Sequence, residues 1–289
     1  MPGHKALCYC FRDTMEILML VLPYVAKDGL TRVDLVSSEC NVLWFQEPVE
    51  RQVTVVLDDP VFTSTRHLHT HLSKIAPRCR DVVLTVMTYV SSRRADVAIA
   101  ALSRFPTIRK ITLSNIGVLI DLEPLSRSAT LQKLELDMVS GGVDSITKLP
   151  QLRALDLRCG VYDLRGIHKG LTALTHIGFF TYIADDGLED VLKIQGLRSL
   201  VLDDCWADQP VNTWPPILGG LQSLTSLQFT DCILESEGDV FSTLGLMTLT
   251  RLERLCIDRA FVTTDVCKEL MALCPALRCI QDKQGNNLV

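Results

Sequence analysis

The chain has 289 residues, of which 47% are hydrophobic and only 6% aromatic, and its formal net charge is −5. A mean hydropathy of +0.23 excludes the polar composition of a disordered protein, and the negative charge argues against nucleic acid as a direct ligand. No apolar run reaches the roughly 18 residues that span a bilayer, and the N-terminus lacks the pattern of a secretory signal. We therefore expect an intracellular, cytoplasmic protein that does not enter the membrane.

The first fifty residues differ from the rest of the chain. The apolar run Ile17–Leu22 predicts a buried helix that ends near Pro23. We expect residues 1–50 to form a small helical module and residues 51–289 to form the main domain.

Several further elements can be placed by their patterns. Gln52–Leu57 predicts a strand that caps the main domain, and a helix should follow over residues 64–76. Short helices are also expected at residues 95–102, 188–194 and 264–271, with Thr264 as the N-cap of the last one.

Three histidines alternate with other residues at the start of the expected helix over residues 64–76. His67 and His71 would lie one turn apart, a spacing that can bind zinc. However, Leu68, Leu72 and Ile75 mark the buried face of that helix. We interpret both histidines as solvent-facing, and we expect no metal site.

From Cys79 to Ile280 one pattern recurs nine times: an apolar residue, two variable residues, an apolar residue, one variable residue and another apolar residue. Copies begin at residues 79, 108, 131, 152, 174, 197, 224, 252 and 277, so neighbouring copies are 21 to 29 residues apart. The clearest copies are Leu131–Leu136, Leu152–Leu157, Leu197–Leu202 and Leu224–Phe229. This pattern and period resemble leucine-rich repeats. The resemblance implies an α/β fold, a curved horseshoe-shaped solenoid with a parallel sheet on its concave face.

The chain has eleven cysteines. Their odd number argues against a disulfide framework, and the absence of a CxxC pair argues against a zinc ribbon. Cys159, Cys205 and Cys232 each follow the third apolar position of a repeat, in a slot that Asn115 fills in an earlier repeat. Leucine-rich repeats place Asn or Cys there. We expect these three cysteines to be reduced, buried and structural, and we expect no cofactor.

Part of the N-terminal module resembles an F-box. Tyr24-Val25, Leu30, Arg32, Leu35-Val36 and Leu43 fall at the spacing of that family, whereas Cys40 stands where the family usually has tryptophan. The resemblance implies docking on a Skp1-like adaptor through Leu22, Tyr24, Val25, Leu30, Leu35 and Val36. The alternative is a helical cap, which any solenoid needs at its end.

The concave face should carry the variable residues that flank the apolar strand positions. Five of these are acidic, namely Glu135, Asp137, Asp156, Asp203 and Asp258, and basic residues that include Arg158 lie beside them. An acidic strip favours a partner that presents Lys or Arg. The alternative is that these positions are only solvated.

Aromatic residues are scarce, so their positions are informative. Phe180, Tyr182 and Trp206 follow two neighbouring strands and should lie along one edge of the sheet. Aromatic side chains often supply the energetic centre of an interface. They could equally fill a gap between irregular repeats.

No catalytic or nucleotide-binding motif occurs among GxSxG, GxxxxGK[ST], HExxH and GxGxxG. We therefore predict a non-enzymatic protein-interaction module. One hypothesis is an F-box-type adaptor that holds a basic-surfaced substrate for a cullin-RING ubiquitin ligase. The alternative is a structural scaffold subunit of a large cytoskeletal, ciliary or ribonucleoprotein assembly.

Overall fold

The computed structural model describes residues 32–34, 52–57, 64–75, 79–85, 92–116, 120–139, 143–160, 162, 164–180, 185–205, 218, 220–232, 246–258 and 263–288. The predicted adaptor-docking residues Leu22, Tyr24, Val25, Leu30, Leu35 and Val36 lie outside these ranges, as do Tyr182 and Trp206.

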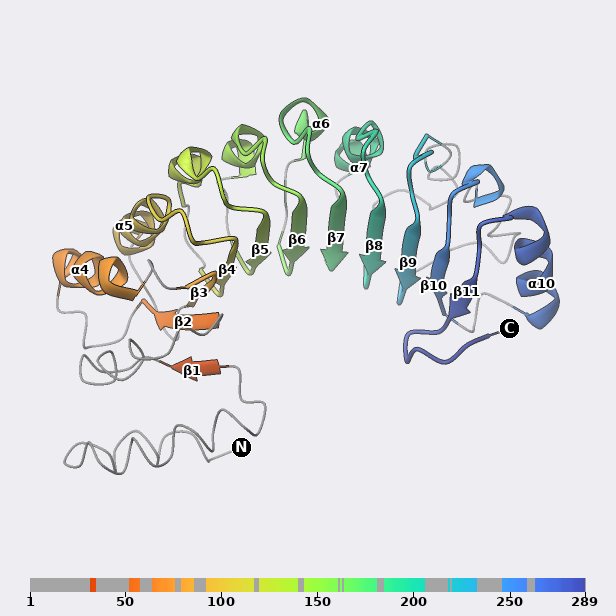
Figure 1. The fold of residues 1–289 in the computed structure, drawn as a ribbon, viewed down its shortest axis with the longest axis horizontal. Coiled ribbons are helices and arrows are strands. Elements are labelled where there is room, and N and C mark those ends of the chain that lie inside the picture. Colours follow the sequence, from red (N-terminus) through yellow and green to blue (C-terminus); the bar gives the residue numbers. More distant parts are fainter. Residues whose placement is uncertain are drawn as a thin grey trace, which may run out of the picture.

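Eleven strands within the described residues form one curved sheet, and each pairs in parallel with the next strand in the chain (Figure 1). They are β1 (Arg32–Asp34), β2 (Gln52–Val56), β3 (Asp81–Thr85), β4 (Lys110–Ser114), β5 (Lys133–Asp137), β6 (Ala154–Arg158), β7 (His176–Phe180), β8 (Ser199–Asp203), β9 (Ser226–Thr230), β10 (Arg254–Ile257) and β11 (Cys279–Gln281). The strands line the inner side of an arc and the helices lie on its outer side. The predicted curved α/β solenoid with a parallel concave sheet is confirmed.

The length of each repeat determines what fills its outer side. The strands β2, β3 and β4 start 29 residues apart, and the full helices α4 (Thr65–Ile75) and α5 (Ser92–Leu102) lie between them. Repeats of 21 and 22 residues separate the starts of β5, β6 and β7, and they have room only for η3 (Val143–Lys148) and α6 (Ile167–Gly170). The remaining outer elements within the described ranges are η2 (Glu123–Arg127), α7 (Asp185–Leu192), η5 (Leu246–Thr248) and α10 (Thr264–Leu273). No helix in the described ranges is both long and apolar enough to cross a membrane.

The core is a stack of aliphatic side chains contributed by alternate strand residues. Ile111 and Leu113 of β4, and Leu134 and Leu136 of β5, are at most 1% exposed. Each repeat adds such a pair to the continuous core, which the parallel pairing keeps in register. Truncating one of these leucines to alanine would cost about 2–5 kcal/mol.

The prediction for the three cysteines is right for two of them and wrong for Cys159. Cys205 and Cys232 are buried, and their thiols donate to the carbonyl oxygens of Phe179 (3.2 Å) and Leu202 (3.5 Å). Cys159 is exposed. The reason is register: Cys159 directly follows its strand, whereas Cys205 and Cys232 come one residue later. The position directly after the strand has left-handed backbone at Asn115, Met138, Cys159, Asp204 and Asp231.

Two further predictions about helices need correction. His67 is exposed as expected, but His71 is only 5% exposed. Because His71 follows Leu68 by three residues, it lies on the same buried side of α4 as Leu68. The N-cap of α10 is Thr263 and not Thr264, since the Thr263 hydroxyl accepts a hydrogen bond from the Val266 N–H.

Both ends of the sheet are extended beyond the predicted strands. The strand β2 was expected to cap the sheet, but β1 pairs with it, with Val33 opposite Val53. β1 lies within residues 1–50, so the sheet continues into that segment. At the other end the chain turns at Gly285, whose φ is +82°, and Asn287 forms an antiparallel bridge with Gln281. The tail therefore covers the open edge of β11.

Candidate functional site

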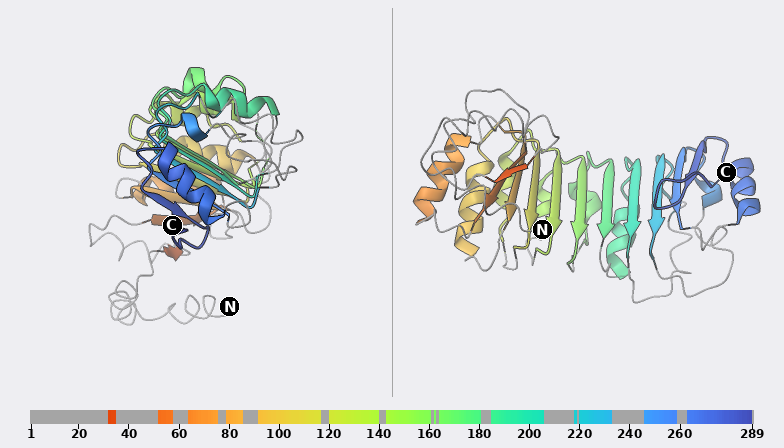
Figure 2. Two further views of the ribbon diagram at one scale, coloured as in Figure 1. Left: turned by 90° about the vertical axis from the view of Figure 1, so that its right-hand side faces the viewer. Right: turned by 90° about the horizontal axis from the view of Figure 1, so that it is seen from below.

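The first, third and fifth residues of each central strand point away from the core and line up in rows across the concave face. The right-hand view of Figure 2 shows the strands of this face from below. The middle row includes Thr112, Glu135, Asp156, Gly178 and Val201 in successive strands. We name the hydrogen-bonded part of this surface the concave network; it comprises Lys110, Thr112, Lys133, Glu135, Asp156, His176 and Ser199.

Glu135 is the first carboxylate of the concave network. The ammonium groups of Lys110 and Lys133 each lie 2.9 Å from its Oε1, and the Thr112 hydroxyl donates to its Oε2 at 2.8 Å. Burial alone would raise the pKa of this carboxyl, but these three hydrogen bonds outweigh burial and hold the pKa below its ordinary value. The negative charge of Glu135 is therefore balanced by the two lysines within the concave face.

Asp156 is the second carboxylate and the more deeply buried, with a side chain only 5% exposed. Lys133 binds its Oδ2 at 2.8 Å, and His176 Nε2 lies 3.0 Å from its Oδ1. Burial alone would raise its pKa, but the hydrogen bonds from His176 and Lys133 outweigh burial and lower the pKa to about 2. Lys133 thus bridges the two carboxylates.

His176 continues the concave network from β7 to β8. Because Asp156 is ionised and can only accept, Nε2 of His176 donates to it. In the neutral imidazole Nδ1 is then the acceptor, and the Ser199 hydroxyl donates to it at 2.9 Å. Serine, histidine and aspartate in this order resemble a nucleophile–base arrangement, but the Ser199 N–H, a candidate oxyanion donor, donates to the Thr175 carbonyl at 2.9 Å. The arrangement therefore fixes side chains in place without supplying that oxyanion donor.

Gly178 makes room for the concave network. A Cβ atom built on Gly178 would lie 2.6 Å from Asp156 Oδ1 and 2.9 Å from the Phe180 ring. Any side chain at this position would push the carboxylate away from His176. The absence of a side chain at residue 178 is thus a requirement of the site.

Arg158 and Phe180 are the last residues of β6 and β7, and the register of these strands places them side by side. The Arg158 guanidinium lies 3.9 Å from the centroid of the Phe180 ring, a cation–π contact. The Tyr162 hydroxyl donates to the Arg158 carbonyl at 2.8 Å and supports the turn after β6. The sequence placed both residues at this surface, and the structure brings them together.

The acidic edge, which we define as Asp203, Asp231 and Asp258, lies at the C-terminal ends of β8, β9 and β10. Lys283 of the tail reaches it, with its ammonium 3.1 Å from Asp203 and in contact with Asp231. Hydrogen bonds to Asp231 and Asp203 raise the pKa of Lys283. Asp258 accepts from the Asp231 N–H at 2.6 Å. Asp137, one of the predicted acidic residues, accepts instead from the Ser114 hydroxyl at 3.2 Å.

Sequence reasoning missed His176 and Lys283. His176 occupies the first outward position of β7, which aligning the repeats would have revealed. Lys283 is 80 residues from Asp203, and no local pattern indicates their contact. Among the described residues, no group of three His, Cys, Asp or Glu side chains is arranged to hold a metal ion.

Comparison with solved structures shows what this geometry is similar to. The leucine-rich repeat-containing protein LegL7 from Legionella pneumophila matches over 89% of this chain and 91% of its own, at 14% identity and a TM-score of 0.55. This chain has a leucine-rich-repeat fold. An internalin, InlF from Listeria monocytogenes, matches 80% of the chain at 17% identity and a TM-score of 0.46, and the match spans 66% of the internalin. No protein-family model matches the sequence, and a search of curated proteins finds no match.

The leucine-rich-repeat fold accounts for the shape of the site but not for its chemistry, because one fold can carry many functions. Function must therefore be argued from the side chains on the concave face.

Proposed function

We propose that the chain is a non-catalytic protein-binding module whose partner contacts the concave face between β4 and β10. The observation that carries the proposal is the concave network. It holds six polar side chains besides Asp156 in fixed positions on a rigid sheet. A surface that is ordered before binding loses less conformational entropy when a partner docks.

The Arg158–Phe180 pair is the proposed anchor of this surface. Phe180 is partly exposed and Arg158 is exposed, so a partner can cover both. Aromatic and arginine side chains dominate the energy of protein interfaces. Of the other predicted contact residues, Glu135 and Asp156 would contribute shape and hydrogen bonding, because lysines already neutralise their charge.

A basic group of the partner would fit best at the acidic edge. The Lys283 ammonium already contacts both Asp203 and Asp231. We expect a lysine of the partner to bind these carboxylates in the same way. We propose that the partner's basic residues displace Lys283 or approach Asp258 beside it.

The experiment is a quantitative capture assay with the full chain, in which mass spectrometry compares bound proteins. We expect the Arg158→Ala, Phe180→Ala double variant to lose a partner that the wild type retains. The control is Lys148→Ala on η3, an exposed residue on the outer side, which should retain it. Equal retention by the double variant would reject the concave face as the binding surface.

A more specific form of the proposal is the F-box-type adaptor, which docks on a Skp1-like protein and presents a substrate to a cullin-RING ubiquitin ligase. It rests on the motif resemblance at Tyr24-Val25, Leu30 and Leu35-Val36. The full-length Tyr24→Ala, Leu30→Ala variant should then lose the Skp1-like partner and keep the concave-face partner. Absence of a Skp1-like protein from the wild-type sample would exclude this form.

The scaffold alternative, a structural subunit of a large cytoskeletal, ciliary or ribonucleoprotein assembly, is favoured by one observation. The strand β1 joins the sheet of the solenoid, as expected if part of residues 1–50 belongs to a cap. The capture assay distinguishes this role, because it predicts one stable particle in fixed stoichiometry with the wild-type chain. The division into a 1–50 module and a 51–289 domain stays a prediction.

A further inference from the structure

A second row of side chains lies outside the concave network, one residue before each strand. Its backbone hydrogen bonds continue the sheet, beginning with the Arg109 N–H that donates to the Arg80 carbonyl at 2.8 Å. We name it the pre-strand row; in order it contains Arg80, Arg109, Gln132, Arg153, Thr175, Arg198, Thr225, Glu253 and Arg278. Arginines therefore recur along one edge of the sheet.

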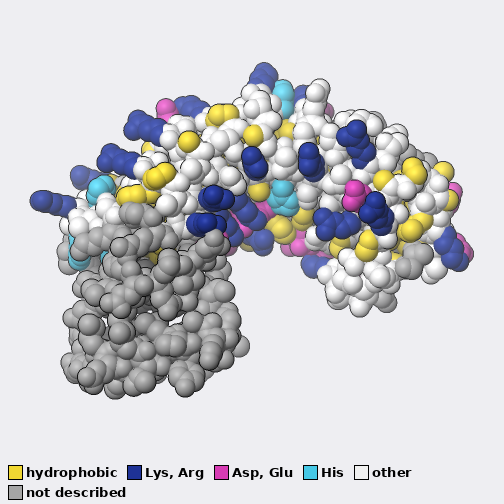
Figure 3. Space-filling model, viewed as in Figure 1, with side chains coloured by type: hydrophobic (Ala, Val, Ile, Leu, Met, Phe, Trp, Pro, Cys, Tyr) yellow, Lys and Arg dark blue, Asp and Glu magenta, His cyan; other side chains and the backbone are white. Residues whose placement is uncertain are grey.

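Four arginines of this row differ from the charged side chains of the concave network, which pair with one another. Arg109, Arg153, Arg198 and Arg278 are all exposed. No ion pair found in the described part of the chain involves any of them. Figure 3 shows Lys and Arg side chains spaced along the molecule on the face drawn in Figure 1, with fewer acidic side chains among them.

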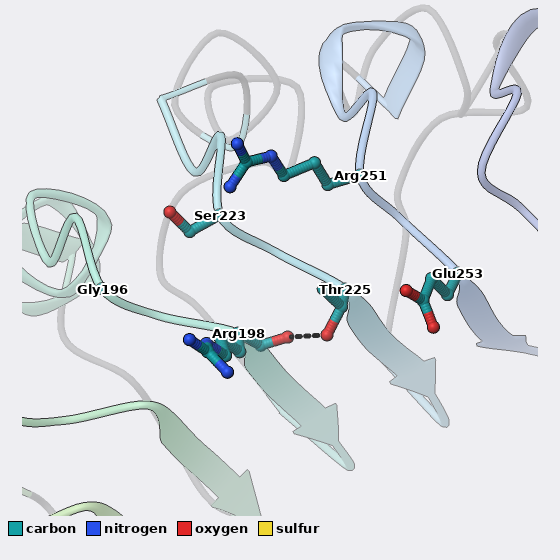
Figure 4. A pocket seen from close by; sticks show the side chains of 6 residues that line it. All are labelled: Gly196, Arg198, Ser223, Thr225, Arg251 and Glu253. Atoms are coloured by element: carbon teal, nitrogen blue, oxygen red, sulfur yellow. Dashed lines mark hydrogen bonds between the residues drawn. The ribbon is translucent and has the colours of Figure 1, made fainter.

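A hollow of about 410 Å³ opens within the row between β8 and β10. Its lining consists of Gly196, Arg198, Ser223, Thr225, Arg251 and Glu253. In Figure 4 the Ser223 hydroxyl lies between the guanidinium groups of Arg251 above it and Arg198 below it. The Thr225 hydroxyl donates to the backbone carbonyl oxygen of Arg198 at 3.1 Å. This hydrogen bond does not involve the Arg198 guanidinium group. Two guanidinium groups and a hydroxyl are a suitable donor set for a carboxylate.

We propose that the pre-strand row and this hollow bind an extended acidic segment of a partner protein. This surface is separate from the concave face, so the proposal goes beyond the function inferred above. One carboxylate of the segment enters the hollow between Arg198 and Arg251, and another pairs with Arg153.

The spacing of the row fits an extended segment. Arg153 and Arg198 precede β6 and β8, so two strand separations of about 4.8 Å place them roughly 10 Å apart. A polyproline II segment advances about 9 Å in three residues. Acidic residues at every third position would therefore meet successive arginines.

Protein is favoured over nucleic acid by the charges around the row. Glu253 interrupts the row, and the acidic edge lies at the other ends of the same strands, roughly 17 Å away for a five-residue strand. A polyphosphate carries a charge on every nucleotide and cannot avoid these carboxylates, whereas a protein segment can place its carboxylates at the arginines and neutral residues elsewhere. The pre-strand row also contains no aromatic side chain on which a base could stack.

The test is a fluorescence-anisotropy titration of the full chain with a labelled twelve-residue peptide, (Glu-Pro-Pro)₄, at about 0.1 M salt, where the Debye length is about 10 Å. The probe with Gln in place of Glu has the same shape without charge. We expect the acidic probe to bind and the neutral one not to bind. The Arg153→Gln, Arg198→Gln, Arg251→Gln variant, which we name the arginine variant, should weaken binding by on the order of tenfold or more.

The matched control removes the same number of positive charges elsewhere. Lys148, Lys193 and Lys268 each already pair with a carboxylate, and changing all three to Gln should alter the affinity less than about twofold. Failure of the acidic probe to bind, or equal losses in both variants, would overturn the proposal. Tighter binding of a twelve-nucleotide uridine RNA, lost in the arginine variant, would also overturn it and assign the row to nucleic acid.

Discussion

The concave network and the pre-strand row cross the same strands, yet their charges are arranged in opposite ways. In the network each carboxylate has two or more donors, as Asp156 has in Lys133 and His176. In the pre-strand row, Arg153 and Arg198 lie one residue before β6 and β8. Both are exposed and take part in none of the ion pairs found among the described residues.

Position on the sheet explains the difference. Side chains in the middle of the concave face are partly covered by their neighbours, and a charge there is costly unless it is paired. Side chains at the starts of the strands extend into water, where an unpaired charge costs little. Internal pairs therefore shape the surface, whereas the exposed arginines keep their charge for a partner.

The largest expected effect comes from breaking the concave network at its most buried carboxylate. Asp156→Ala leaves Lys133 and His176 without their acceptor, so the free energy of unfolding should fall by about 3 kcal/mol. Urea denaturation measures the loss. Asp265→Ala is the control, because the Asp265 side chain is 93% exposed and its pairing with Lys268 should contribute less than about 1 kcal/mol. Similar losses in the two variants would mean that burial does not set the cost.

Gly178→Ala should weaken the same network through shape alone. The new Cβ would lie 2.6 Å from Asp156 Oδ1, so the carboxylate must move and we expect a loss of about 2 kcal/mol by urea denaturation. In the matched variant Gly196→Ala, the nearest atom to the new Cβ would be the Leu174 carbonyl oxygen at an ordinary 3.6 Å. A loss at residue 178 no greater than at residue 196 would show that the space is not required.

Acid should remove the contribution of Asp156. Its folded-state pKa of about 2 lies below the ordinary value of 3.8, so the stabilisation is present above about pH 4 and is lost as the pH falls through 2. The shift corresponds to about 2 kcal/mol. The difference in unfolding free energy between wild type and Asp156→Asn should therefore shrink by that amount between these pH values. A difference that does not change with pH would contradict the lowered pKa.

A smaller effect, outside both rows, tests the corrected start of α10. Thr263→Ala removes the hydroxyl that accepts from the Val266 N–H and should cost about 1 kcal/mol of unfolding free energy. Thr264→Ala should cost only a few tenths of that amount. A larger loss of unfolding free energy in Thr264→Ala than in Thr263→Ala, measured by thermal or urea unfolding, would show that Thr264 is the N-cap.

The repeat could be predicted from the sequence because the buried slot tolerates little variation. Pairs such as Leu134 and Leu136 must be apolar in every copy, so the pattern repeats even where the copies differ in length. The bounds of α5 and α7 and the N-cap of α10 were predicted less accurately, because helix ends depend on single capping contacts such as that of Thr263.

The site was harder to predict than the fold. Glu135 and Asp156 were identified as outward residues, but their neutralisation depends on Lys110 and Lys133 of adjacent strands. Those contacts require the exact register between repeats of unequal length. Cys159 shows the same sensitivity, since a shift of one residue moves it from a buried slot to an exposed left-handed position.

The most direct test of the division between structural and available charges is the free energy of unfolding of the arginine variant. Because Arg153, Arg198 and Arg251 are exposed and belong to none of the ion pairs found in the described ranges, urea denaturation should give a value within about 0.5 kcal/mol of wild type. A loss of about 2 kcal/mol or more would show that these arginines stabilise the fold through internal contacts, which would contradict their assignment to a partner.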